Sequence, residues 1–259
     1  MDLLLFKLFV TPSLLLLASL AVRRWGEAVG GLLVGMPLTS GPVSVFLALE
    51  HGPAFATQAT AGSLVATIAQ VAFCVIYCRL AAQGWLLALT GAAGAFVVVA
   101  ALLQWSALPE MLLFLLALIA ITLALNVMPN TAAASAKVDA PSWDLPLRMV
   151  LIAALIVSVT LIAPYVGASA AGVIASFPFM AIILAVFAHR ASGAAAAQQV
   201  MRGMATGLIG FAAFFFVLSL LLTHTHLVVA YGSAILCTLA IQAMSFYRMR
   251  SLPAALPVE

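Results

Sequence analysis

Charged side chains are scarce in this sequence. Only 7% of the 259 residues are Asp, Glu, Lys or Arg, whereas about a quarter are charged in an average soluble domain. Hydrophobic residues make up 66% of the chain. This balance excludes a soluble globular domain and predicts that lipid surrounds most of the protein.

Catalytic and metal-binding patterns are missing as well. The sequence has no Gly-x-Ser-x-Gly, no His-Glu-x-x-His, no phosphate-binding glycine-rich loop and no paired carboxylates within an apolar run. His224 and His226 alone offer too few ligands for a metal ion. The three cysteines are too few and too scattered for a disulfide framework, so we interpret them as packing residues. We therefore expect neither an enzyme nor a bound cofactor.

Long apolar runs are abundant. Nine runs of about twenty residues are each long enough to cross a hydrocarbon core of about 30 Å as a helix. Lipid favours α-helices because each span must satisfy its own backbone hydrogen bonds, and the alternation typical of barrel strands is absent. We predict an all-α polytopic membrane protein with spans at residues 3–21, 27–49, 54–78, 84–104, 109–128, 146–166, 168–188, 194–222 and 226–247.

The basic residues indicate the membrane topology. The net charge is +3, but the basic residues stand singly or in pairs between apolar runs, which argues against a nucleic-acid-binding patch. With the amino terminus outside, one side of the membrane carries Arg23, Arg24, Arg79, Lys137, Arg148, Arg190, Arg248 and Arg250. The opposite side carries Glu50, His51, Glu110, His224 and His226. The positive-inside rule then places the carboxyl terminus in the cytoplasm.

The chain contains an internal duplication. A stretch from Gly31 to Gly62 returns 141 positions later, from Gly172 to Gly203, without a gap. Each copy interrupts an apolar run with a proline, and duplicated units with broken helices indicate a central binding site or pathway in membrane proteins. The identical pairs are Gly31/Gly172, Pro37/Pro178, Val45/Val186, Phe46/Phe187, Gly52/Gly193, Gln58/Gln199 and Gly62/Gly203.

The fifth span has no counterpart in either copy. One extra crossing between two four-span units makes the second unit enter the membrane in the opposite orientation. We therefore predict an inverted 4+1+4 repeat in which helices 2 and 7 are broken. Residues 1–106 form the first repeat, 107–145 the inverting helix and a cytoplasmic linker, 146–250 the second repeat and 251–259 a disordered tail.

The prolines mark the candidate substrate-binding site. A proline frees the backbone carbonyl four residues earlier, and nearby hydroxyls add polar groups that can line a cavity. The alternative is that these prolines only shape helix packing, as they often do in membrane helices. We assign Pro37, Thr39, Ser40, Ser44, Ser176 and Pro178 to the site.

Two matched glutamines complete this site in our prediction. An inverted repeat brings Gln58 and Gln199 toward the pseudo-two-fold axis, although each can instead form a structural hydrogen bond between helices. Gly31-x3-Gly35 and Gly203-x3-Gly207 have the spacing of closely packed membrane helices.

Three charged residues are candidates for coupling or for the entrance of the pathway. Glu50 can bind protons or cations, and Arg190 can attract an anion at the opposite mouth. The alternative places both among the lipid headgroups. Arg202 is the most inward of the cytoplasmic charges, and it can also extend to the membrane surface.

The stretches Gly31-Leu-Leu-Val-Gly-Met-Pro-Leu-Thr-Ser40 and Ala171-Gly-Val-Ile-Ala-Ser-Phe-Pro178 resemble the second helix of the small four-helix bacterial inner-membrane proteins of the GlpM type. Each copy corresponds to about one such protein. The resemblance implies a multi-pass protein of the bacterial inner membrane and says little about a substrate. The 4+1+4 plan is also similar to that of fused fluoride channels, by architecture alone.

Our preferred prediction is a transporter or permease for a small, uncharged or amphipathic solute, since buried charges that could hold a charged one are few. A second class is a non-transporting scaffold subunit of an envelope lipid or polysaccharide pathway. A third is an ion channel. The expected partners are the lipid bilayer and the solute, with a second copy of the chain or other membrane subunits as alternatives.

Overall fold

The computed structural model describes residues 32–106, 108–129, 150, 154, 157–158, 161–162 and 164–251. Within these ranges all regular structure is helical and no β-strand is present. The elements in chain order are α3 (Ser40–His51), α4 (Pro53–Leu80), η1 (Ala81–Gln83), α5 (Trp85–Ser106), α6 (Glu110–Val127), α8 (Ala168–Ala175), α9 (Phe179–Ser192), α10 (Ala194–Leu221) and α11 (Leu227–Ser251).

Six described stretches are long and apolar enough to cross a membrane, namely Pro53–Gln83, Trp85–Ser106, Glu110–Val127, Ala168–Ser192, Ala194–Leu221 and Leu227–Tyr247. They coincide with predicted spans three, four, five, seven, eight and nine, which confirms an all-helical protein of membrane type. Predicted span one, most of span six, the start of span two and the predicted linker lie outside the described residues. The total of nine spans therefore stays a prediction.

Glycines with positive φ join the helices of each copy. Gly52 (φ 89°) connects α3 directly to α4, and Gly193 (φ 84°) connects α9 directly to α10. Residues other than glycine rarely adopt this backbone conformation. The two glycines are a matched pair of the duplication, and the helices that follow them also match. Each helix has 28 residues, and α10 begins and ends 141 positions after α4.

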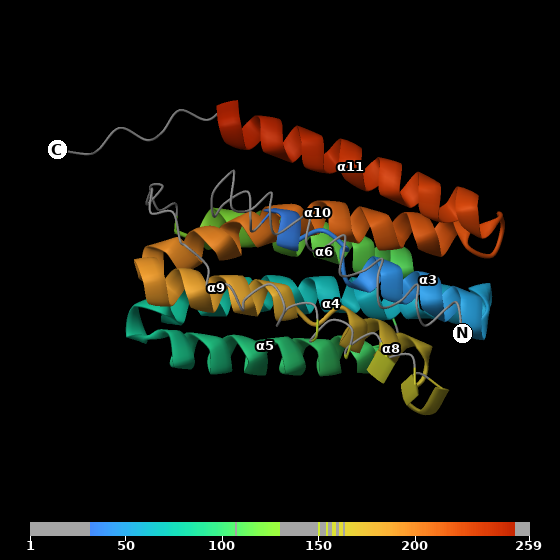
Figure 1. Cartoon of the computed structure of the whole chain (residues 1–259), viewed down its shortest axis with the longest axis horizontal. Coiled ribbons are helices and arrows are strands. Elements are labelled where there is room, and N and C mark those ends of the chain that lie inside the picture. The colour runs from blue at the N-terminus through green and yellow to red at the C-terminus, as the bar shows by residue number, and fades with distance from the viewer. Residues whose placement is uncertain are drawn as a thin grey trace.

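The long helices α4 and α10 form the centre of the bundle. In an 18-residue apolar stretch of each helix 67% of the residues are buried, against 22% in α5 and α6 and 28% in α11. The two helices run in opposite directions (Figure 1), and the amide of Gln198 at the start of α10 donates to the carbonyl of Cys78 at the end of α4 (3.0 Å). This antiparallel pair is the core on which the other helices pack.

The remaining helices pack on this pair in corresponding ways. Helices α3 and α5 contact α4, whereas α9 and α11 contact α10. Helix α6 contacts both α4 and α10. Large apolar side chains face outward from the peripheral helices, among them Leu102 and Val97 on α5, Leu123 on α6 and Leu236 on α11. These outer faces suit contact with lipid chains.

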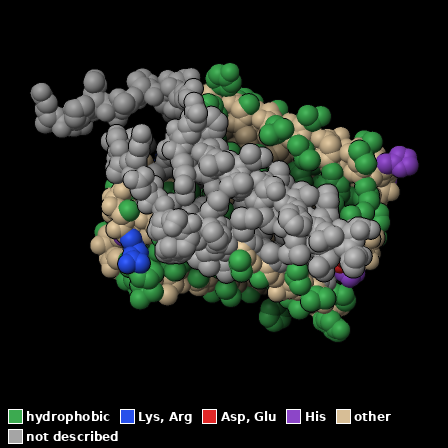
Figure 2. All heavy atoms as spheres, in the orientation of Figure 1, with side chains coloured by type: hydrophobic (Ala, Val, Ile, Leu, Met, Phe, Trp, Pro, Cys, Tyr) green, Lys and Arg blue, Asp and Glu red, His purple; other side chains and the backbone are tan. Residues whose placement is uncertain are grey.

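Charged side chains of the described residues lie near the ends of the bundle. Arg79 and Arg190 stand in the last turns of α4 and α9, which meet at one end through the Tyr77–His189 contact. Figure 2 shows a basic side chain at one end of this face and histidines at the other. This separation agrees with the charge pattern read from the sequence.

Candidate functional site

The first helix break lies at residues 35–39, between a helical turn at 32–34 and α3. The Met36 N–H donates to the Leu33 carbonyl (3.0 Å), and the Leu38 N–H donates to the Met36 carbonyl (2.7 Å). Helical bonding resumes when the Gly41 N–H donates to the carbonyl of the buried Pro37 (2.9 Å). The break is thus confined to residues 35–39.

Gly41 and Pro42 do not belong to the break. Both lie in the first turn of α3. A proline is tolerated in a first helical turn because its missing N–H has no intrahelical acceptor there. Gly41 packs instead against the ring of Phe214 on α10.

Glycines bring the first break against α10. A methyl group on Gly35 would meet the Met204 carbonyl and Gly207, and one on Gly207 would meet the Leu32 carbonyl and Gly35. The backbones therefore touch at this crossing. Among the glycines of the two Gly-x3-Gly motifs, Gly35 and Gly207 have the close-packing role predicted from their spacing.

Two buried serines follow the first break. The Ser44 hydroxyl is hydrogen-bonded to the hydroxyl of Tyr231 on α11 (2.8 Å). Ser40 is only 1% exposed, and its hydroxyl has no hydrogen-bond partner among the described residues. Thr39 is half-buried and makes no side-chain cap on α3.

Helix α11 adds a glutamine to this region. The Gln242 amide nitrogen donates to the Gly207 carbonyl (2.9 Å), directly beside the Gly35 crossing. Its amide oxygen is buried and finds no partner in the described part of the chain. Neither Gln242 nor Tyr231 was predicted from the sequence, although a polar side chain in an apolar span was a visible signal.

The second helix break lies at Ser176–Pro178, between α8 and α9. The Ser176 hydroxyl donates to the Ser63 hydroxyl on α4 (3.2 Å). The Gln70 amide nitrogen donates to the Ser176 backbone carbonyl. Helix α4 therefore satisfies the polar groups that the break exposes, while the Gln70 amide oxygen stays buried and unpartnered within the described ranges.

Glycines again allow this close approach. A methyl group on Gly62 would strike the Ser169 carbonyl, and one on Gly172 would strike the Ala59 carbonyl. Ser63 lies at the same crossing, where its hydroxyl donates to the Ala59 carbonyl (3.3 Å). Each break thus packs on the long helix of the other copy, the first on α10 and the second on α4. Helices α3 and α8, which flank the two breaks, also contact each other.

The structure places the two matched glutamines differently. Gln199 is buried on α10, whereas Gln58 is exposed on α4. The exposure of Gln58 does not fit a position at a central axis. The matched positions did not predict this difference between Gln58 and Gln199. Gln199 lies near the start of α10, which packs against η1 and the end of α4.

Glu50 and Arg190 lie at the surface rather than in a cavity. Glu50 is exposed at the end of α3, and Arg190 is exposed at the end of α9. The Arg190 guanidinium carbon lies 6.0 Å from the centre of the Trp85 ring, a cation–π arrangement at the start of α5. This geometry agrees with the alternative in which both charges lie among headgroups.

Arg202 binds the end of helix α6. One guanidinium nitrogen donates to the carbonyls of Leu125 (2.8 Å) and Met128 (3.0 Å). The last carbonyls of a helix lack intrahelical partners, and a cation is favoured at that end. Arg202 therefore joins α10 to α6 through the two terminal carbonyls.

We expect Arg202→Met to lower the free energy of unfolding by about 2 kcal/mol, since two hydrogen bonds to a charged donor are lost. Arg202→Lys keeps the charge without the planar guanidinium, so its loss should be intermediate. Unfolding of the purified protein by SDS in mixed micelles measures both. Wild-type stability in Arg202→Met would show that the side chain instead reaches the membrane surface.

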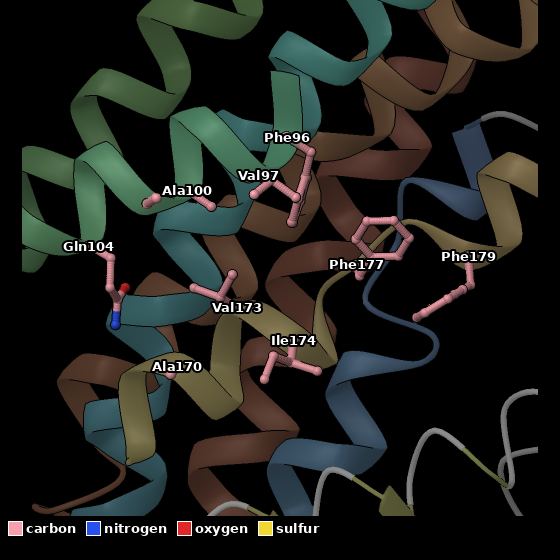
Figure 3. A pocket seen from close by; sticks show the side chains of 10 residues that line it. Phe96, Val97, Ala100, Gln104, Ala170, Val173, Ile174, Phe177 and Phe179 are labelled. Carbon is pink, nitrogen blue, oxygen red and sulfur yellow. The ribbon is translucent and has the colours of Figure 1, made fainter. Parts of the chain in front are cut away.

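An apolar pocket opens between α5 and α8, next to the second break (Figure 3). Its volume is about 560 Å³. The rings of Phe96 and Phe177 meet edge to face in its wall, with centroids 5.1 Å apart. The lining consists of Phe96, Val97, Ala100, Ala101, Gln104, Ala170, Val173, Ile174, Phe177 and Phe179.

These groups define the available chemistry. The breaks offer hydroxyls, amides and backbone carbonyls, which can bind an uncharged polar group through hydrogen bonds. No group of three or more His, Cys, Asp or Glu side chains in the described residues is placed to hold a metal ion.

Comparisons with known proteins give no match: no protein family, no curated protein and no solved structure is similar to this chain. The resemblance to the GlpM-type proteins stays a prediction.

Proposed function

We propose that the protein is a membrane transporter or permease for a small, uncharged or amphipathic solute, with its site between two inverted repeats. The matching bounds and opposite directions of α4 and α10 support the inverted arrangement. The pairing of each helix break with the long helix of the other copy supports a shared site. The helical turn at 32–34 and α3 flank the first break, and α8 and α9 flank the second.

One observation carries this proposal. Ser40, Gln70 and Gln242 are 1%, 4% and 6% exposed, and each holds a polar atom that lacks a partner among the described residues. Buried polar atoms are hydrogen-bonded in the large majority of cases, and an unpaired one is unfavourable. Three of them beside two helix crossings are explained by a ligand that supplies the missing bonds during transport.

The chemistry of these atoms favours an uncharged solute. They belong to a hydroxyl and two amides, and the described charged side chains lie near the ends of the bundle. A charged group bound between helices needs a partner of opposite charge. The proposed site therefore takes hydrogen bonds and apolar contacts rather than an ion.

Purified protein in liposomes tests the proposal with two probes. Glycerol entry is followed by light scattering, and an NBD-labelled single-chain amphiphile is followed by its reduction with dithionite, which reaches only the outer leaflet. We expect the protein to accelerate at least one of them over protein-free liposomes. No acceleration of either, together with stable co-purification of other membrane subunits, would favour the scaffold function instead.

We further propose a bacterial inner-membrane location with the amino terminus outside and the carboxyl terminus in the cytoplasm. Gln83 in η1 and Thr225 after α10 are both exposed and lie on opposite sides in this arrangement. In a background without native cysteines, an impermeant maleimide should label Thr225→Cys in intact spheroplasts and Gln83→Cys only after permeabilisation. Labelling of both from the same side would contradict the inverted repeat.

A further inference from the structure

The pocket between α5 and α8 has the size and composition of a ligand site. Its volume of about 560 Å³ lies within the range of about 300–1,000 Å³ that is typical of small-molecule sites. Nine of the ten lining residues are Ala, Val, Ile or Phe, and the tenth is Gln104. Such a wall suits a hydrocarbon chain with one hydrogen-bonding group.

The pocket is polar at one end only. Gln104 and Phe179 lie at opposite ends of the labelled side chains in Figure 3. Gln104 stands two residues before the end of α5 at Ser106, and Phe96 lies eight residues earlier. At 1.5 Å per residue, the polar group and the aromatic wall are separated by about 12 Å along the helix.

The polar end lies at the depth of the headgroups. Trp105, next to Gln104, is 91% exposed at the end of an apolar span, and tryptophans are enriched at the membrane–water interface. The aromatic end adjoins the second break, where Phe177 follows Ser176 directly. The pocket thus extends from the interface toward the interior of the bilayer, as a single lipid chain does.

The surface around the pocket faces lipid. Val97 lines the pocket and is 60% exposed, and Leu102 on the same helix is 66% exposed. A molecule dissolved in the bilayer can therefore enter from the side without crossing water. This continuity favours an occupant from the membrane over one from solution.

Gln104 supplies an unused acceptor. Its amide oxygen is inaccessible to solvent and has no hydrogen-bond partner in the part of the chain that the structure describes. A buried acceptor is satisfied by a donor such as a hydroxyl or an amine. The occupant that fits all of these observations has an apolar chain and a donor at its head.

We propose that this pocket binds a single-chain amphiphile of the bilayer, whose chain lies against Phe96 and Phe177 and whose hydroxyl or amine donates to Gln104. The inference rests on the proposed function and deepens it, since it identifies a lipid-like amphiphile as the class of solute. The pocket delivers the chain end to the second helix break, beside Ser176.

Photolabelling of the full-length protein in nanodiscs tests the site. The probes are hexadecanol and hexadecane, each carrying a photoactivatable diazirine, and mass spectrometry locates the adducts. We expect hexadecanol adducts on the lining residues of α5 and α8. Ala101→Trp, which fills the pocket from its exposed side, should lower them by about tenfold, whereas Leu102→Trp on the neighbouring lipid-facing position should leave them unchanged.

A second variant tests the head group. Gln104→Leu removes the acceptor at similar size, so hexadecanol labelling should fall by about fivefold, the worth of one hydrogen bond, while hexadecane labelling stays at the wild-type level. Adducts spread evenly over all lipid-facing helices, or equal labelling of wild type and Ala101→Trp, would overturn the proposal.

The binding result does not depend on transport. Pocket labelling without flux of either glycerol or the NBD amphiphile in liposomes would leave this site standing and contradict the transport proposal. Flux without pocket labelling would overturn this site and leave the transport proposal standing. Each proposal can therefore fail alone.

Discussion

Gly62→Ala is expected to lower the free energy of unfolding by about 3 kcal/mol or more, among the largest single-residue effects in this protein. The added methyl group would strike the Ser169 carbonyl, which is backbone and cannot turn away. The helices α4 and α8 must then separate, which also stretches the Ser63–Ser176 hydrogen bond. Gly172→Ala should act similarly at the same crossing through the Ala59 carbonyl.

Gly94 on α5 provides the matched control. A methyl group there meets no atom within 4 Å, and alanine stabilises a helix by up to about 1 kcal/mol relative to glycine. Gly94→Ala should therefore be neutral or slightly stabilising in SDS unfolding, while Gly62→Ala unfolds at much lower SDS. Equal stability of the two variants would mean that α4 and α8 are not in backbone contact.

Much of the architecture could be predicted from composition and spacing alone. Hydropathy predicts helices because a helix satisfies its backbone hydrogen bonds within one apolar run, and the described spans follow that prediction. Pro37 and Pro178 indicated the helix breaks, since each removes a backbone donor. The spacing of Gly35 and Gly207 indicated close packing, and the structure pairs those two glycines with each other.

The partners of the breaks could not be predicted in the same way. Gln70 and Gln242 donate to carbonyls beside the breaks from helices that lie far away in sequence. Such contacts depend on how the helices pack, and one sequence read by its local pattern does not contain that information. The environment of Gln58 could not be predicted from the duplication either, since Gln58 is exposed while the matched Gln199 is buried.

Ser40→Ala is expected to lower the flux of whichever probe the protein transports by about tenfold without loss of stability. The Ser40 hydroxyl is buried and has no partner in the described residues, so its removal breaks no hydrogen bond and relieves the desolvation of an unpaired group. A solute that bonds to this hydroxyl during transport loses that hydrogen bond in the variant. A tenfold drop in affinity corresponds to a loss of about 1.4 kcal/mol in binding free energy. Flux into liposomes and SDS unfolding measure the two quantities separately.

Two further variants, Ser44→Ala and Thr122→Ala, distinguish a loss of solute binding from a general packing defect. Ser44→Ala removes the bond to Tyr231 and leaves a buried phenol unpaired, so its free energy of unfolding should fall by about 1–2 kcal/mol. Thr122→Ala alters only an exposed hydroxyl on the outer side of α6 and should change neither flux nor stability. If Ser40→Ala transports as well as Thr122→Ala, the unpaired hydroxyl does not contact the solute, and the first helix break then serves packing alone.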